Sequence, residues 1–211
     1  MSGIPQINSY DIPNCITPNV ADWVVDVNRA VLLFHDMQNY FLRPFSESSE
    51  PASALTENSI KLKQKCEQYG IPVAYTAQPG SMTPKERGLL KDFWGPGMKA
   101  SAEDRQIIDP LAPTQDDWLL TKWRYSAFAK TNLLERLHAA GRDQIIICGV
   151  YAHVGILTTA LEAFSSDIET FIVSDATADF TYEDHSMALD YAAKRCAMVV
   201  TTEQVLKNME F

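Results

Sequence analysis

Two side chains that follow apolar runs of the sequence could together transfer a proton. Asp36 comes directly after the run AVLLFH, and Lys122 follows the shorter run WLLT. An acid at the edge of the protein interior, with a cation on another strand end, is a common way to set a proton donor or acceptor. A structural ion pair between two strand ends would use the same residue types. Position alone leaves both interpretations open.

Other side chains near strand ends could bind an anionic ligand. Gln78 follows the apolar run IPVAYTA and can donate through its amide. Arg87 can bind a carboxylate through two parallel N–H groups. Phe41 and Trp94 could provide an apolar cover for such a site.

The stretch IIICGVYAHVGIL, residues 145–157, is typical of a strand that runs into a helix. The first turn of a helix presents free N–H groups and the positive end of the helix dipole, which bind anions. We therefore expect the backbone N–H groups of residues 151–155, which include Tyr151, Ala152 and Gly155, to hold a carboxylate. Gly155 also leaves room for a ligand close to the backbone. Close helix–strand packing selects glycine as well, and that alternative stays open.

The four histidines are better candidates for structural roles. His35 is adjacent to Asp36, and neighbouring residues of a strand point to opposite faces, so we expect a buried, hydrogen-bonded His35. His153 is expected to be structural or to orient its neighbours, and His138 and His185 to lie on helix surfaces. Two histidines with one carboxylate form some iron sites, but His35 and Asp36 should diverge, so no metal is expected.

Six apolar runs that alternate with amphipathic stretches must position these residues. Near-continuous apolar strands are typical of a parallel sheet that is buried on both faces. Alternation of strand and helix predicts an α/β fold, and in such sheets ligands bind at the carboxyl ends of the strands. The runs are AVLLFHD, IPVAYTA, DWLLTK, QIIICGV, TFIVSDA and CAMVVTT; the expected helices are residues 57–69, 132–140, 152–164 and 183–195.

Residues 78–113 interrupt this alternation with a stretch rich in Gly and Pro that contains Arg87 and Trp94. Long connections inside a compact domain are usually functional, so a lid over the site is the preferred interpretation. A surface excursion with one short helix is the alternative.

Composition and charge exclude several classes of protein. The chain has 211 residues and a net charge of -9, which argues against a surface that neutralises nucleic-acid phosphates. No apolar stretch approaches the roughly 18 residues of a membrane span, and the N-terminus has no secretory pattern. Cys15, Cys66, Cys148 and Cys196 form no Cys-x-x-Cys pair, and Cys148 is expected to be a small buried hydrophobe. We expect a soluble cytoplasmic protein with no nucleic-acid or membrane partner.

The sequence resembles the isochorismatases, which belong to a larger superfamily of cysteine hydrolases. The resemblance covers about residues 4–206 and is carried by LLFHDMQNYF, YTAQPG, ERGLLKDFWGPGM, TKWRYSAF, GVYAHVGIL and DATADF. The stretches GSMTPKERGLLKDFWGPGM and RCAMVVTT, with the opening MSGIP, look most like the branch found in phenazine biosynthesis.

This resemblance implies a fold and a reaction. It implies a three-layer α/β/α sandwich around a mainly parallel six-stranded sheet, as one domain over residues 1–211 without a carrier-protein domain. It implies hydrolysis of the enolpyruvyl ether of 2-amino-2-deoxyisochorismate to pyruvate and trans-2,3-dihydro-3-hydroxyanthranilic acid, without a cofactor. Isochorismate, as in siderophore pathways, is the alternative substrate. Because the family commonly dimerises, a homodimer is expected. Residues 123–128 are one possible interface, and core packing explains this stretch equally well.

The resemblance also assigns roles to residues. Other hydrolases of the superfamily carry a nucleophilic cysteine where this sequence has Gly155, whereas Asp36 and Lys122 match the other two members of that catalytic set. We therefore hypothesise that Asp36, neutral in the substrate complex, protonates the methylene carbon, with Lys122 on the substrate oxygens. Gln78, Arg87, Trp94, Tyr151, Ala152 and Gly155 would bind the dianionic substrate. The family further predicts a non-proline cis peptide near Val150–Tyr151.

Two other classes of function remain as alternatives. A domain without its nucleophile could be a non-catalytic binding module, although retention of Asp36, Lys122, Gln78 and Arg87 speaks against it. An amidohydrolase of the nicotinamidase kind needs a cysteine and a metal-binding cluster, and neither is visible in the sequence.

Overall fold

The fold is built on a parallel sheet of six strands in the order β3-β2-β1-β4-β5-β6. The computed structural model describes residues 3–13, 17–46 and 48–210, so Cys15 lies outside the described residues. All six predicted strands are present: β1 (Ala30–His35), β2 (Val73–Ala77), β3 (Trp118–Thr121), β4 (Gln144–Val150), β5 (Glu169–Ala178) and β6 (Met198–Val200).

Helices cover both faces of the sheet and produce the predicted three layers. The helices that pack on the sheet are α2 (Ala52–Gln68) and α9 (Thr202–Asn208) on one face, and α6 (Leu133–Ala139), α7 (Leu157–Phe164) and α8 (Tyr182–Arg195) on the other. Alternation along β1 divides the core: Leu32 and Phe34 join the cluster with α2, and Val31 and Leu33 join the cluster with α7. Burial on both faces explains the continuous apolar runs.

The helix boundaries differ from the predicted ones by more than one residue in two places. The α2 helix begins at Ala52, whereas residue 57 was expected, because Pro51 occupies its N-cap. The predicted helix 152–164 is divided into a π-helical turn, η2 (Ala152–Ile156), and α7. Single π-helical turns occur frequently at functional sites.

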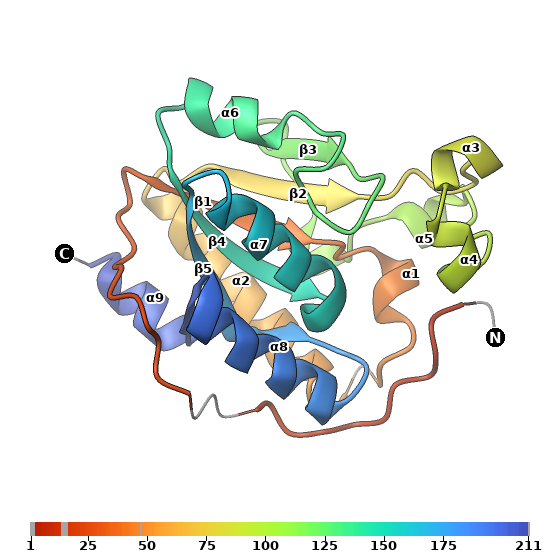
Figure 1. Ribbon diagram of the computed structural model, residues 1–211, viewed down its shortest axis with the longest axis horizontal. Coiled ribbons are helices and arrows are strands. Elements are labelled where there is room, and N and C mark those ends of the chain that lie inside the picture. Colours follow the sequence, from red (N-terminus) through yellow and green to blue (C-terminus); the bar gives the residue numbers. More distant parts are fainter. Residues whose placement is uncertain (1–2, 14–16, 47, 211) are drawn as a thin grey trace.

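Residues 78–113 form an excursion at the carboxyl end of the sheet that contains several short helices. These are α3 (Pro84–Arg87), α4 (Leu90–Trp94), α5 (Ala102–Arg105) and the 3-10 helix η1 (Asp109–Leu111). The alternative of one short helix was therefore wrong. The short helix α1 (Asn39–Leu42) follows β1 and lies next to α5 (Figure 1). Within the described residues, no helix is long and apolar enough to cross a membrane.

Candidate active site

A pocket lies at the carboxyl end of the sheet, under α3 and α4. This is the place where open α/β sheets bind ligands. The predicted site residues that line it are Asp36, Gln78, Arg87, Trp94, Lys122, Tyr151 and Gly155.

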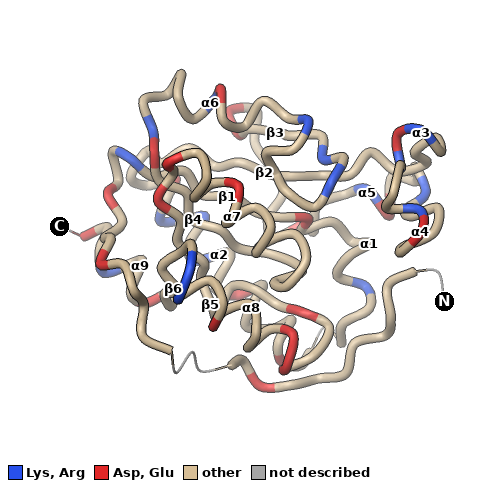
Figure 2. The backbone as a smooth tube through the Cα atoms, viewed as in Figure 1, with Lys and Arg blue, Asp and Glu red and all other residues tan. Residues whose placement is uncertain are grey.

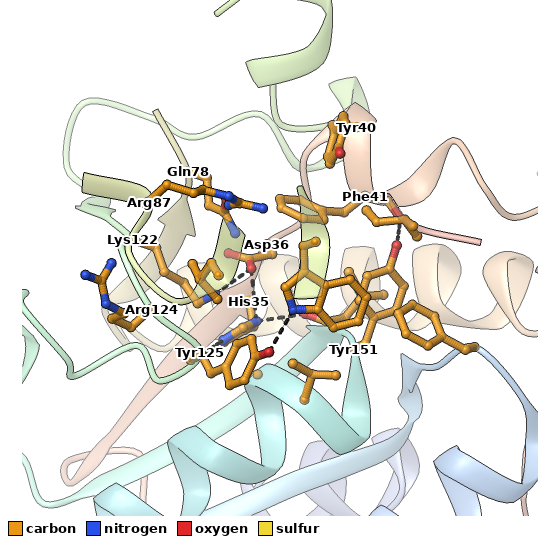
Figure 3. A pocket seen from close by; sticks show the side chains of 17 residues that line it. His35, Asp36, Tyr40, Phe41, Gln78, Arg87, Lys122, Arg124, Tyr125 and Tyr151 are labelled. Atoms are coloured by element: carbon orange, nitrogen blue, oxygen red, sulfur yellow. Dashed lines mark hydrogen bonds and ion pairs between the residues drawn. The ribbon is translucent and has the colours of Figure 1, made fainter. Parts of the chain in front are cut away.

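Asp36 and Lys122 form a buried ion pair at the base of this pocket. Lys122 Nζ lies 2.7 Å from Asp36 Oδ2, and the two side chains are 3% and 6% exposed. Figure 3 shows both side chains directed toward each other from the ends of β3 and β1. Lys122 reaches this point because its backbone N–H donates to the Ala77 carbonyl and so continues the pairing of β3 with β2.

Thr76 holds the other side of Asp36. Its Oγ1 accepts a hydrogen bond from the Asp36 N–H at 3.0 Å and donates to Asp36 Oδ1 at 2.9 Å. Asp36 has φ +54, a left-handed conformation that a non-glycine residue rarely adopts. The two bonds from a fully buried Thr76 stabilise this conformation and fix the carboxyl group. Sequence reasoning missed Thr76, because a threonine inside a strand carries no signal of this role.

His35 is fully buried and hydrogen-bonded, as predicted, but it does not diverge from Asp36. Its Nδ1 lies 2.8 Å from the Val150 carbonyl oxygen and 3.8 Å from Asp36 Oδ2, and both residues line the pocket. The alternation rule fails because β1 ends at His35 and Asp36 turns into the left-handed region. Burial lowers the pKa of His35 to about 4, so its imidazole is neutral.

The space beside Gly155 is filled by His35. A Cβ atom at Gly155 would lie 2.2 Å from His35 Cε1, so close packing, the alternative to an open space, is present here. The helix N–H groups are also engaged: His153 N donates to Asp179, and Val154 N and Gly155 N donate to the Tyr151 carbonyl. The N–H groups of His153, Val154 and Gly155 are therefore not free to hold a carboxylate, and this part of the prediction is wrong. For the N–H groups of residues 151 and 152 it stays a prediction.

The excursion covers the pocket and presents Arg87 and Gln78 to it. Arg87 is 6% exposed; its Nε donates to the Gly95 carbonyl at 3.1 Å and its Nη1 to Gln78 Oε1 at 3.2 Å. Since Gln78 accepts through its oxygen, its amide NH₂ is the group that would donate to a ligand. Burial lowers the pKa of Arg87 from its ordinary value. The guanidinium group still stays protonated, as arginine does in proteins.

A hydrogen bond links this cover to the body of the protein. Trp94 Nε1 donates to the Tyr125 hydroxyl at 2.7 Å, which joins α4 to the loop after β3 (Figure 3). Arg124 also ties the excursion down, since its Nη1 donates to the Glu86 carbonyl at 2.8 Å. Arg124 and Tyr125 line the pocket but were not among the predicted site residues, although both stand in the stretch TKWRYSAF.

Aromatic rings form the wall opposite Lys122. Tyr151 packs on Phe180 with ring centroids 4.4 Å apart, and its hydroxyl donates to the Phe41 carbonyl at 2.6 Å. Its ring, rather than its hydroxyl, is therefore the surface offered to a ligand. The Val150–Tyr151 peptide is cis, which confirms that prediction. Ala152 is buried and is not among the residues that line the pocket, so its binding role stays a prediction.

The remaining histidines lie outside this pocket. His153 Nδ1 lies 2.7 Å from Asp179 Oδ1, which supports the structural role predicted for His153. Burial by itself lowers the pKa of His153, but the hydrogen bond and charge of Asp179 together raise it above its ordinary value. His185 is fully buried against Thr177 and Tyr10, so its prediction as a surface residue was wrong. Burial lowers the pKa of His185 to about 4.

This fold and pocket define the class of protein. The site offers a buried acid paired with a lysine, two further cations and an aromatic wall, and it has glycine where a nucleophile would stand. Within residues 3–13, 17–46 and 48–210, no group of three or more His, Cys, Asp or Glu side chains could hold a metal ion. The arrangement suits proton transfer to an anionic ligand in a hydrolase of the α/β/α class.

Comparison with known proteins identifies the family. Residues 30–204 match the isochorismatase domain, and the chain belongs to the isochorismatase family of hydrolases. It is 57% identical to the phenazine biosynthesis protein PhzD1 of Pseudomonas aeruginosa, over 98% of this chain and 100% of that protein. It is 54% identical to the isochorismatase of Bacillus subtilis, over 98% of this chain and 67% of that protein. A cysteine hydrolase from Pseudomonas syringae shares the fold, with a TM-score of 0.82 at 24% identity over 92% of this chain and 98% of that one.

Proposed function

We propose that this protein hydrolyses the enolpyruvyl ether of 2-amino-2-deoxyisochorismate and releases pyruvate and trans-2,3-dihydro-3-hydroxyanthranilic acid. The observation that carries the proposal is the Asp36–Lys122 pair, buried in a pocket that has no nucleophilic side chain beside it at Gly155. A vinyl ether is an electron-rich alkene, so its cleavage needs an acid and not a nucleophile. The full-length similarity to PhzD1 supports this substrate over isochorismate itself.

The charges of the pocket support a dianionic substrate. The molecule carries a net charge of -9, yet Arg87, Lys122 and Arg124 line this pocket together with one acid, Asp36. Figure 2 shows that acidic and basic residues are otherwise mixed over the molecule, including α3 to α5. A local excess of cations inside a cavity with apolar walls attracts an anionic ligand despite the overall charge. Arg87 and the Gln78 amide would receive one carboxylate of the substrate.

The reaction then proceeds in three steps that consume one water molecule. The protonated Asp36 gives its proton to the terminal methylene carbon, and the C=C electron pair forms the new C–H bond. The ionised Asp36 stabilises the resulting oxocarbenium ion electrostatically. Water then adds to the oxocarbenium carbon and forms a hemiketal, while the proton that the water loses returns to Asp36. The hemiketal breaks its C–O bond to the ring, which leaves as the alcohol, and pyruvate is released. Lys122 balances the charge of Asp36 and would contact the substrate oxygens.

The test of this proposal is the release of pyruvate, coupled to lactate dehydrogenase, by wild type and Asp36→Ala. Positioned general acids contribute about 10²–10⁴-fold, so the variant should lose at least that factor in kcat while it still binds substrate. In heavy water, the released pyruvate should carry one deuterium in its methyl group. Pyruvate without that deuterium, or normal turnover by Asp36→Ala, would exclude the mechanism.

The same assay decides between the alternatives. Comparison of kcat/KM for 2-amino-2-deoxyisochorismate and isochorismate separates the phenazine from the siderophore assignment. A non-catalytic binding module would bind either compound and release no pyruvate.

A further inference from the structure

The His35 side chain contacts three separate parts of the pocket wall. Its Nδ1 lies 2.8 Å from the carbonyl oxygen of Val150, at the end of β4, and its Nε2 lies 3.3 Å from the carbonyl oxygen of Tyr125, after β3. Its ring lies against Gly155 in η2. Figure 3 shows His35 beneath Asp36 with these interactions drawn. One ring thus connects the ends of β1, β3 and β4.

The same ring occupies the volume that any side chain at position 155 would require. A Cβ atom there would lie 2.2 Å from His35 Cε1 and 2.8 Å from Nε2, below any distance that real Cβ contacts show. The ring cannot give way easily, because it is fully buried and its Nδ1 is held by the Val150 carbonyl oxygen at 2.8 Å. A cysteine at position 155 and this imidazole therefore exclude each other.

We propose that His35 is a positioning residue for the ether cleavage, and that it forms a functional pair with Gly155 in which its ring replaces the missing nucleophile side chain. The proposal rests on the proposed function, because the group that it positions is the acid Asp36. His35 is the residue before Asp36 in the chain, and its Nδ1 lies 3.8 Å from Asp36 Oδ2. Displacement of the ring would shift the backbone from which the Asp36 carboxyl group projects.

The chemistry of the ring fits this role. Both partners of the nitrogens are carbonyl oxygens, which only accept, and the shorter distance places the single proton of the neutral ring on Nδ1, as a donor to Val150. A neutral ring adds no positive charge next to Asp36. Among the described residues that form ion pairs or hydrogen bonds with the Asp36 carboxyl group, Lys122 is then the one that carries a positive charge.

The test is a double-mutant cycle with His35→Asn and Gly155→Ala. The asparagine amide can donate to Val150 as Nδ1 does, but it lacks the Cε1 and Nε2 atoms that a Cβ at position 155 would strike. Gly155→Ala alone should lower kcat by about 100-fold or more, because the displaced ring moves Asp36. If the two substitutions acted independently, the fold-losses in kcat of the single variants would multiply in the double variant. We expect kcat of the double variant to be about tenfold higher than that value, and such a factor lies within the range of coupling energies measured for residues in contact. Additive effects on kcat would overturn the pair.

His185→Asn is the matched control. His185 is buried as fully as His35, but it contacts Thr177 and Tyr10 and does not line the pocket. Its replacement should lower Tm and leave kcat of the folded protein unchanged. If His35→Asn behaves in the same way, with a lower Tm and an unchanged kcat, then His35 has only a structural role and the proposal is wrong.

The cycle also separates failure of this inference from failure of the proposed function. Wild-type protein that releases no pyruvate from either substrate would refute the function. The coupling between the two positions is then measured by urea unfolding, where the double variant should be more stable than the sum of the single effects predicts. Additive unfolding free energies would refute the contact itself.

Discussion

At the scale of single residues, the buried Asp36–Lys122 pair is the feature on which both stability and chemistry depend. Removing one member of a buried ion pair leaves the other charge without a partner, which typically costs about 3–5 kcal/mol. Lys122→Met should therefore lower the free energy of unfolding by about that amount, measured in urea, and should reduce pyruvate release strongly. The exposed pair of Arg43 with Asp104 provides the control. Arg43→Met should cost at most about 1 kcal/mol, as exposed pairs do.

An equal loss of stability in both variants would contradict the burial argument. A second comparison uses Asp36→Asn combined with Lys122→Met. The double variant should regain part of the stability that Lys122→Met loses, because the carboxylate of Asp36 is then no longer left buried without its partner.

At the scale of elements, the short helix α3 determines where Arg87 lies. Thr83 and Glu86 form a capping box at its N-terminus, with the Thr83 N–H donating to Glu86 and the Glu86 N–H donating to Thr83 Oγ1. Loss of such a cap costs about 1 kcal/mol. In a four-residue helix on the surface, this cost should open the cover locally without unfolding the domain. Thr83→Ala should therefore raise KM for the substrate by about fivefold, the factor that corresponds to about 1 kcal/mol, and leave Tm nearly unchanged.

The helix α9 offers a matched control for this prediction. Thr201 and Gln204 form the same capping box there, and Thr201 is exposed as Thr83 is. Because α9 packs on the core through Val205, Thr201→Ala should lower the stability of the whole domain and leave KM unchanged. The reverse pattern, a raised KM in Thr201→Ala only, would refute the role of α3 as a cover.

At the scale of the whole molecule, the buried histidines set how stability depends on pH. The pKa of both His35 and His185 is lowered by burial to about 4, from an ordinary value of 6.5. Between these values the unfolded chain binds more protons than the folded one, so stability falls as pH falls from 6.5 toward 4. Each histidine should contribute a slope of up to about 1.4 kcal/mol per pH unit. Urea unfolding of wild type and His185→Gln across this window should show a shallower slope in the variant.

His153 acts in the opposite sense. The pKa of His153 is raised in the folded protein, so its pairing with Asp179 stabilises the fold to the full extent at pH values below the ordinary pKa of histidine. This stabilisation is lost as the pH rises through the pKa of His153 in the folded protein. The stability difference between wild type and His153→Gln should therefore shrink above pH 6.5. A difference that grows with rising pH would contradict the assignment.

The homodimer stays a prediction at this scale. Within residues 123–128, Ser126, Ala127 and Phe128 are buried, and Arg124 and Tyr125 line the pocket, so core packing accounts for this stretch. Light scattering of the purified protein would measure the oligomeric state directly.

The sequence by itself determined the six strands, the layers and the position of Asp36 and Lys122. These follow from local patterns: continuous apolar runs are buried on both faces, and parallel strands bring their carboxyl ends to one edge. The family motifs further predicted the cis peptide at Val150–Tyr151.

Tertiary structure alone decided what surrounds those residues. Thr76 is brought to Asp36 by the pairing of β1 with β2, and the ring of His35 lies beside Asp36 because of the left-handed turn after His35. Neither feature is encoded in a local pattern. The sequence could show that position 155 has no side chain, but not that an imidazole from a strand 120 residues earlier fills the space. Contacts between distant segments depend on the register and on how each strand ends, which only the folded chain fixes.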